Sequence, residues 1–232
     1  MVDKFKANLN TSAADVLTEN IRNLILSGEL KPGYEFPHEE EFCKELGVSR
    51  GTLREAYKAL ETSGYIKRVK GHGTIVSELS QIMEAAPFGE KIRLVNLVEL
   101  MEFREMIETE ATRFAALRAT KEDIEVLEEA VKMMAQNMED ITKFATYDVH
   151  FHMQIAYASK NPLLISSMKP LEDSISRGVF SAFRIDTPEN MSEAIVFHKN
   201  ILEAVKNKDV EKAGDIMRSH LQSVTRRVSK TK

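Results

Sequence analysis

Residues 37–66 read PHEEEFCKELGVSRGTLREAYKALETSGYI, and this stretch decides the fold of the N-terminal part of the chain. A short helix begins near Pro37 and stops at Gly47, because glycine readily takes the positive φ that ends a helix. Ser49 can then cap a further helix, which Gly64 terminates. Four apolar residues of that helix recur at helical spacing and form its buried stripe: Leu53, Ala56, Tyr57 and Leu60. The stretch therefore predicts two helices joined by a tight turn.

The flanking sequence completes a winged helix-turn-helix. Upstream, residues 11–28 have a capping Thr-Ser pair, apolar residues at helical spacing and a terminating glycine. Downstream, residues 65–76 have the composition of two strands around the turn sequence KGHG. Three helices followed by a hairpin are the order of a winged helix-turn-helix, whose third helix enters the major groove of DNA. We therefore expect residues 1–77 to bind double-stranded DNA.

The charge of this region also indicates DNA binding. The whole chain has a net charge of −4, but residues 44–73 contain seven basic and three acidic side chains. A solvated helix face is the ordinary explanation of such a run. The order of helices and hairpin favours DNA instead, because guanidinium groups read base edges, and hydroxyls and lysines contact phosphates. The candidate DNA-binding residues are Ser49, Arg50, Gly51, Thr52, Arg54 and Lys58 on the third helix and Lys67, Lys70 and His72 on the hairpin.

The composition limits the remaining possibilities. With 232 residues, of which 43% are apolar and 29% charged, the chain can form two modest globular domains. Its single cysteine excludes an internal disulfide and a cysteine-built metal site. No apolar run is long enough to span a membrane, and the first residues lack the apolar core of a signal peptide. We therefore expect a cytoplasmic protein without a membrane partner.

Beyond residue 77 the sequence predicts a linker and then an all-helical domain. Residues 78–89 have weak periodicity and include Pro87 and Gly89, which favour a linker. Residues 90–232 divide into periodic helical segments separated by caps and turns. The expected fold is therefore mostly α. It consists of the winged helix-turn-helix followed by an antiparallel bundle of six or seven helices, which serves effector binding and dimerisation.

Four polar side chains lie on the apolar stripes of the predicted bundle helices. Asp148 and His152 face the core one helical turn apart, and His198 and His220 do so on two later helices. A single buried histidine or an Asp–His pair is ordinarily a hydrogen-bonded core residue. Together, one carboxylate and three imidazoles instead form a donor set that suits zinc, nickel, cobalt or manganese. We expect a divalent metal ion there, with zinc as the first choice.

These motifs resemble those of a known family. Residues 37–56, 64–66 and 71–76 are similar to the DNA-binding domain of GntR-family repressors. Glu40 departs from the pattern, because many members have an arginine at that place. Five motifs of the second part resemble the FadR-like (FCD) ligand-binding domain in its metal-bearing branch: Asp148, His152, Asn161-Pro162, His198 and His220.

The resemblance implies a homodimeric transcriptional repressor whose helical domain binds the metal and a small organic acid as effector. A dimer would bind a pseudo-palindromic operator, because one recognition helix reads only a few base pairs. Arg104 and Arg184 are the candidates for gripping the carboxylate of the acid. Their alternatives are an ion pair between Arg104 and Glu108 and a solvated Arg184.

Two other functions stay open from the sequence. One is a regulator for which the metal itself is the signal, and the other is a metalloenzyme. The predicted stripes contain no second inward carboxylate that could act as a general base, which disfavours the enzyme.

Overall fold

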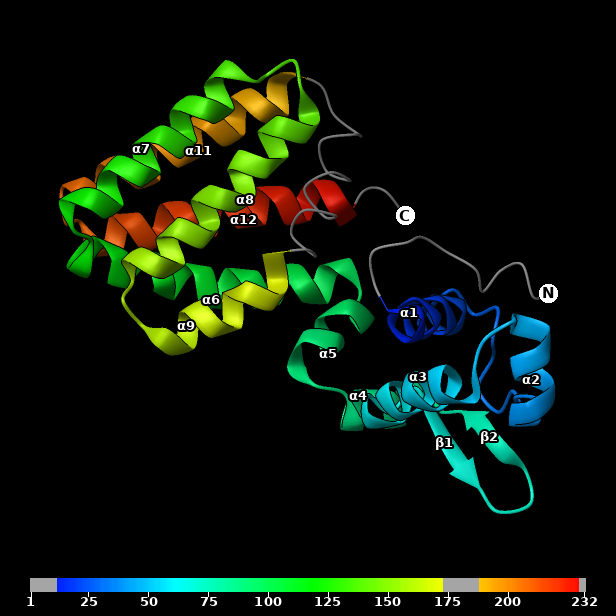
Figure 1. The fold of residues 1–232 in the computed structure, drawn as a ribbon. Coiled ribbons are helices and arrows are strands. Elements are labelled where there is room, and N and C mark those ends of the chain that lie inside the picture. Colours follow the sequence, from blue (N-terminus) through cyan, green and yellow to red (C-terminus); the bar gives the residue numbers. More distant parts are fainter. Residues whose placement is uncertain (1–11, 173–187, 230–232) are drawn as a thin grey trace. The chain divides into compact units, whose positions relative to one another are not determined.

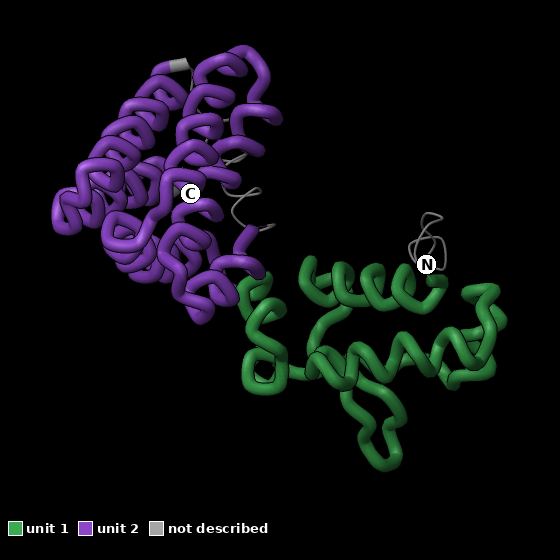
Figure 2. Tube along the Cα trace, turned by 60° about the vertical axis from the view of Figure 1, so that its left-hand side comes forward, with its two compact units in different colours: residues 1–94 green, residues 95–232 purple. Residues whose placement is uncertain are grey.

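The structure is a computed structural model that describes residues 12–172 and 188–229. Arg184, one of the two expected effector-binding arginines, lies outside the described residues. The chain divides into two compact units, residues 1–94 and 95–232, which Figure 2 distinguishes by colour. Each unit is described by itself. In the described ranges, no helix combines the length and the apolarity needed to cross a membrane.

The first unit contains the predicted winged helix-turn-helix (Figure 1). Its elements are α1 (Ala13–Leu26), α2 (Glu39–Leu46), α3 (Arg50–Thr62), β1 (Ile66–Val69) and β2 (Gly73–Val76). The two strands pair antiparallel, with Ile66 opposite Val76. α1 packs against α3, and all three helices and the hairpin contribute side chains to one apolar core. The core holds the apolar stripe of α3 that the sequence predicted.

Local sequence signals set the ends of these helices. The Oγ of Ser12 accepts a hydrogen bond from the Asp15 amide at 3.1 Å, and the Oγ of Ser49 accepts one from the Thr52 amide at 3.0 Å. Gly47 ends α2 with a φ of 67°, a left-handed conformation that favours glycine. The turn between α2 and α3 is therefore tight, as a helix-turn-helix requires.

Two further short helices follow the hairpin: α4 (Leu79–Ala85) and α5 (Phe88–Leu94). α4 lies within residues 78–89, where the sequence predicts a linker. Ile82 and Ala86 lie in the core of the first unit. Gly64, which follows α3, has a φ of 76°, and a Cβ at this position would lie only 2.7 Å from the Cβ of Ala85. Glycine thus lets α4 pack directly against the end of α3. This stretch is therefore part of the first unit's packing.

The second unit is a helical bundle. Its elements are α6 (Leu97–Arg118), α7 (Lys121–Gln136), α8 (Ile141–Ala158), α9 (Pro162–Met168), a 3-10 turn at Lys169–Leu171, α11 (Pro188–Lys206) and α12 (Val210–Ser229). α6 packs against α8 and α12, and α7 packs against α8 and α11. Side-chain caps begin four of the helices: Asn96, Thr120, Asp140 and Asn161. The mostly helical fold with a C-terminal bundle is as predicted.

The α-helical hydrogen bonding changes after α9. α9 ends at Met168, and a 3-10 turn at Lys169–Leu171 follows. Pro170 explains the change, because it has no backbone N–H to donate and its ring clashes with the preceding turn of an α-helix.

Candidate functional site

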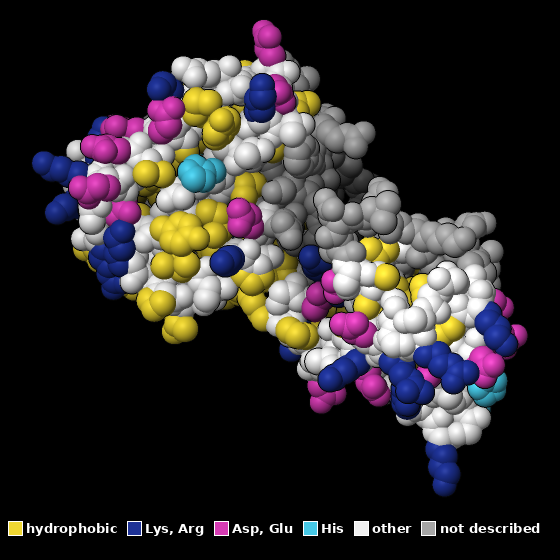
Figure 3. All heavy atoms as spheres, viewed as in Figure 1, with side chains coloured by type: hydrophobic (Ala, Val, Ile, Leu, Met, Phe, Trp, Pro, Cys, Tyr) yellow, Lys and Arg dark blue, Asp and Glu magenta, His cyan; other side chains and the backbone are white. Residues whose placement is uncertain are grey.

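Two arginines dominate the exposed face of α3. Arg50 occupies its first turn and Arg54 lies one turn later, with 62% and 66% of their side chains exposed. Lys58, one further turn along, is exposed as well. The spacing of four residues places these three cations on one face of the helix. Figure 3 shows that Lys and Arg side chains gather on the lower part of this unit, with Asp and Glu side chains among them.

The small residues at the start of α3 have local roles. Ser49 caps the helix, and its Oγ lies 2.8 Å from the Oγ1 of Thr52. Both hydroxyls therefore have partners within the chain, and each would bind a phosphate by sharing that partner. A Cβ at Gly51 would meet only the Oγ of Ser49 at 3.6 Å, which is an ordinary contact. Packing within the protein does not require glycine there, so the role of Gly51 in DNA binding stays a prediction.

The hairpin directs its basic side chains to different neighbours. The Nζ of Lys67 donates to the Oε1 of Gln81 in α4 at 2.8 Å. Arg68 is instead close to α2, because its Nη2 lies 3.3 Å from the Oε1 of Glu39. Adjacent strand residues point to opposite faces of the hairpin, which accounts for the different neighbours of Lys67 and Arg68. Lys70 and His72 are exposed around the turn.

Glutamates accompany the cations of this surface. The nitrogen–oxygen distances are 2.9 Å for Arg50–Glu40, 2.9 Å for Arg54–Glu39 and 2.7 Å for His72–Glu35. The hydrogen bond from Arg54 to Glu39 raises the pKa of the guanidinium, which therefore keeps its charge. Sequence reasoning missed these contacts, because they join residues that only the fold brings together. Arg50 and Arg54 of α3 are thus each paired with a glutamate of α2.

Asp148, His152, His198 and His220 meet in the core of the second unit. α8 supplies the first two, α11 supplies His198 and α12 supplies His220. All four are buried, and each can place a ligand atom within 4.8 Å of those of the others. The Nε2 atoms of His152 and His198 lie 3.2 Å apart, and the Oδ1 of Asp148 lies 3.6 Å from the Nε2 of His198. The structure therefore brings together the four residues that the stripes predicted.

The electrostatics of this cluster fit a divalent cation. Burial is the largest cause that lowers the pKa values of His198 and His220 well below 6.5, so both imidazoles stay neutral. A neutral imidazole offers one lone pair, and the Nε2 of His198 is the nitrogen that faces His152 and Asp148. Burial also raises the pKa of Asp148. A bound cation would accept the lone pairs and would favour the ionised form of the carboxylate, so the residues present suit zinc or a related ion.

Glu108 of α6 supports the cluster from behind. Its Oε2 lies 2.5 Å from the Nδ1 of His152, a close contact that lacks the alignment of a hydrogen bond. Its Oε1 accepts a hydrogen bond from the Nε of Arg104 at 2.7 Å. Burial alone raises the pKa of Glu108, but the charges of Arg104 and His152 outweigh burial and lower it to about 2. A carboxylate at Nδ1 keeps the proton on that nitrogen and leaves Nε2 of His152 free for a metal.

Arg104 forms the ion pair that was the alternative to effector binding. Its side chain is buried, and besides Glu108 its Nη1 contacts the Sδ of Met101 at 3.6 Å. Its charge nevertheless reaches the cluster, since it lowers the pKa values of Asp148, His198 and His220. The structure thus places Arg104 beside the candidate metal site and pairs it with Glu108.

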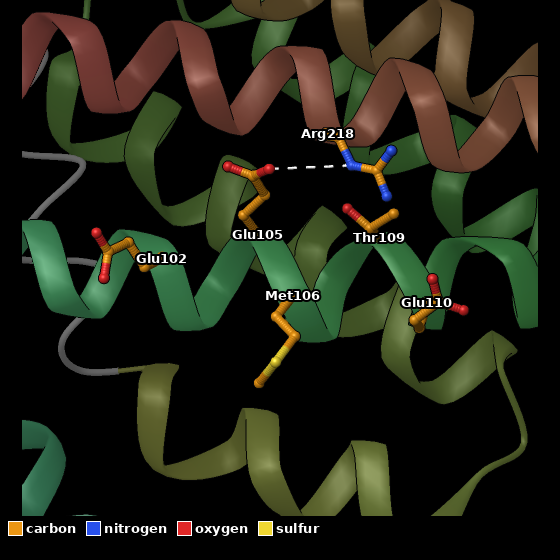
Figure 4. Close-up of a pocket in the computed structure, with 6 residues that line it drawn as sticks. All are labelled: Glu102, Glu105, Met106, Thr109, Glu110 and Arg218. Carbon is orange, nitrogen blue, oxygen red and sulfur yellow. Dashed lines mark ion pairs between the residues drawn. The ribbon is translucent and has the colours of Figure 1, made fainter.

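A separate surface hollow lies on the outer side of α6 and α12 (Figure 4). Its lining residues are Glu102, Glu105, Met106, Thr109, Glu110 and Arg218. Figure 4 shows Glu105 turned toward Arg218, and the two charged groups are 3.9 Å apart. Three carboxylates against one guanidinium give this hollow a negative charge, which disfavours an acidic ligand.

Comparison with known proteins gives the family. Residues 13–76 match the model of the bacterial regulatory proteins of the gntR family, and residues 99–223 match the FCD domain. The chain belongs to the GntR family of transcriptional regulators, in the branch that carries an FCD domain. Members of this family bind operator DNA, and the chain is a regulator rather than an enzyme.

The similar curated proteins are regulators of both signs. The Glc operon transcriptional activator of Escherichia coli K12 is 29% identical over 90% of this chain and 86% of its own length. The galactonate operon transcriptional repressor of the same strain is 25% identical over 95% of this chain and 98% of its own length.

Solved structures share the fold. The structure of Lar, which controls the Listeria monocytogenes agr system, has a TM-score of 0.68 at 20% identity and covers 97% of this chain and 100% of its own. The GntR protein of Streptococcus agalactiae has a TM-score of 0.51 at 25% identity and covers 92% of this chain and 99% of its own.

Proposed function

We propose that this regulator is a homodimeric repressor that binds a divalent metal ion, zinc first, and releases its operator when a small organic acid binds beside that metal. The buried cluster of Asp148 with three histidines carries this proposal. Burying a carboxyl group and three imidazoles together in an apolar core costs free energy unless a cation binds their lone pairs. The matched FCD domain holds all four within residues 99–223.

The DNA part of the proposal assigns base reading to α3. Arg50 and Arg54 supply guanidinium groups that can donate hydrogen bonds to guanine. Phosphate contacts come from Lys58 and from the hairpin residues Lys70 and His72. A twofold-symmetric dimer would bind two half-sites of a pseudo-palindrome.

The effector part follows from charge. A metal ion held by one carboxylate and three neutral imidazoles keeps a net positive charge and attracts an anionic oxygen. The charge of Arg104 behind the cluster is offset by the carboxylate of Glu108, so the metal ion would supply the attraction. The hollow on α6 and α12, by contrast, is acidic. One relative is named for the operon of galactonate, a sugar acid, which agrees with this chemical class.

The test combines metal and acid. The metal-free chain, the zinc-loaded chain, and the zinc-loaded chain with each of a set of sugar acids, hydroxy acids and dicarboxylates are compared in operator binding and in thermal unfolding. We expect an acid that stabilises only the metal-loaded chain and weakens its binding to the operator, because an effector must bind the two states differently. If zinc alone changes operator affinity and no acid does, the metal is the signal and the effector proposal fails.

The sign of regulation has its own test. The proposal of repression rests on relatives that are named repressors, whereas the Glc operon relative is an activator. Expression of a reporter gene placed downstream of the operator should rise when the gene for this chain is deleted. A fall would make the chain an activator.

A further inference from the structure

Glu40 is an exposed acidic residue of α2 that lies beside the base-reading face of α3. Its Oε2 lies 2.9 Å from the Nη2 of Arg50, and both side chains have 62% of their surface exposed. Its Oε1 lies 3.3 Å from the Nζ of Lys44, one turn along α2. A carboxylate therefore stands within hydrogen-bond distance of the guanidinium of Arg50 and is open to the solvent side of the helix-turn-helix.

The neighbouring Glu39 differs from Glu40 in burial and in partners. Only 28% of its side chain is exposed, and its two oxygens are engaged by Arg54 at 2.9 Å and Arg68 at 3.3 Å. Glu39 thus links α2 to α3 and to the hairpin, and both of its carboxylate oxygens already have partners within the protein. The two ion pairs of Glu40 are both exposed to solvent. Exposed ion pairs are weak, so Glu40 can exchange them for contacts with a ligand.

A carboxylate at this place limits what Arg50 can bind. Beside a DNA phosphate the carboxylate would meet a like charge, which is unfavourable. At a base edge in the major groove it would meet a hydrogen-bond donor only at the amino groups of cytosine and adenine. Guanine presents its O6 and N7 acceptors to an arginine, and the N4 amino group of the paired cytosine lies next to that O6. An arginine with an acceptor at its side therefore matches a guanine with its paired cytosine.

We propose that Glu40 is a specificity-determining residue that reads one G·C base pair in each half-site jointly with Arg50. Arg50 donates to the guanine, and Glu40 accepts from the N4 amino group of the cytosine. This inference rests on the proposed role of α3 in reading bases.

The experiment selects binding sites from random double-stranded DNA with the full chain and its variants. The variants are Glu40→Ala, Arg50→Ala and, as a matched control, Glu45→Ala, which removes the same charge from another exposed position of α2. Affinities are then measured for the selected site and for its versions with each other base pair at the position that Arg50→Ala alters. We expect Glu40→Ala to reduce the preference for G·C at that position by about tenfold, the scale of one good base contact. The other positions of the site and the Glu45→Ala variant should keep the original preference.

Two results separate failure of this inference from failure of the proposed function. If Glu40→Ala raises the affinity for all sequences by one factor and leaves the preferred site unchanged, Glu40 only weakens phosphate binding and the inference is overturned. If Arg50→Ala selects the same site as the unaltered chain, α3 does not read bases through Arg50, and the proposed assignment of that helix fails with it.

Discussion

His198 and His220 are held neutral by burial, and this has a consequence for stability. Burial lowers their pKa values in the folded chain, while the unfolded chain titrates near the ordinary value of about 6.5. Below that pH the unfolded state binds protons that the folded state does not bind. The free energy of unfolding of the metal-free protein should therefore decrease as the pH is lowered below about 6.5. The decrease is up to about 1.4 kcal/mol per pH unit for each histidine.

Urea unfolding of the metal-free chain at several pH values between roughly 5 and 8 measures this slope. His198→Gln and His220→Gln should each reduce it. His150→Gln is the control, because His150 is exposed on the same helix as His152. Equal slopes for all three variants would show that the buried imidazoles are not held neutral.

Glu108 compensates two buried groups at once, so its removal should be costly. In Glu108→Ala the guanidinium of Arg104 stays buried without its carboxylate, and His152 loses its partner. Breaking a buried ion pair in this way costs about 3–5 kcal/mol of unfolding free energy. Glu102→Ala, at an exposed position of the same helix, should change it by less than about 0.5 kcal/mol. Denaturant unfolding compares the two, and a similar small loss for both would contradict the role given to Glu108.

At the scale of elements, Gly64 determines how α4 packs on α3. Gly64→Ala meets two penalties: a positive φ, at about 1–2 kcal/mol, and a Cβ only 2.7 Å from Ala85, at about 1–3 kcal/mol. Gly71→Ala is the matched control, because Gly71 also has a positive φ but nothing within 4 Å of the added Cβ. Thermal unfolding should show the larger loss for Gly64→Ala. Equal losses would mean that α4 does not press on α3.

α3 and the hairpin should contribute to DNA binding in different ways. Arg54→Ala should lower the preference for the operator over random DNA by about 1–3 kcal/mol, the range of a bidentate contact with a base. Lys70→Ala should weaken binding to all sequences alike and reduce the salt slope by about one, because a lysine on a phosphate releases one counterion. Titrations of operator and random DNA at several salt concentrations distinguish the two. A Lys70→Ala variant with altered site preference would contradict this division.

The sequence predicted most elements because their signals are local. Ser49 caps α3, Gly47 ends α2, and the helical periodicity of α8 places Asp148 and His152 on the same buried face. The linker prediction missed α4, because a helix of seven residues with Ile82 as its buried residue has too little periodicity to recognise. The pairs of Glu39 and Glu40 with arginines of α3 join separate elements. Only the folded packing of α2 on α3 shows them.

At the scale of the whole molecule, the metal ion should couple to folding. We expect the purified chain to hold about one divalent ion and to lose it at acid pH, because the imidazoles must be neutral to bind it. Zinc at about 100 times its dissociation constant should raise the free energy of unfolding by about 2.7 kcal/mol. Metal analysis and thermal unfolding, with and without a chelator, measure both. His152→Ala should abolish this stabilisation by zinc, and His150→Ala should keep it. If zinc does not stabilise the unaltered chain, the four buried residues are hydrogen-bonded core residues and not metal ligands.

The packing of α4 on the first unit determines where this chain can be recombined with others. Ile82 and Ala86 belong to the core of the first unit, whereas Asn96 caps the first helix of the second. A chimeric regulator joined after Val76 would strip these side chains from the DNA-reading part and leave their partners exposed to water. A junction at Val95 would exchange the sensing part for that of a relative and keep both cores intact. Biosensors for other metabolites would therefore be assembled at Val95.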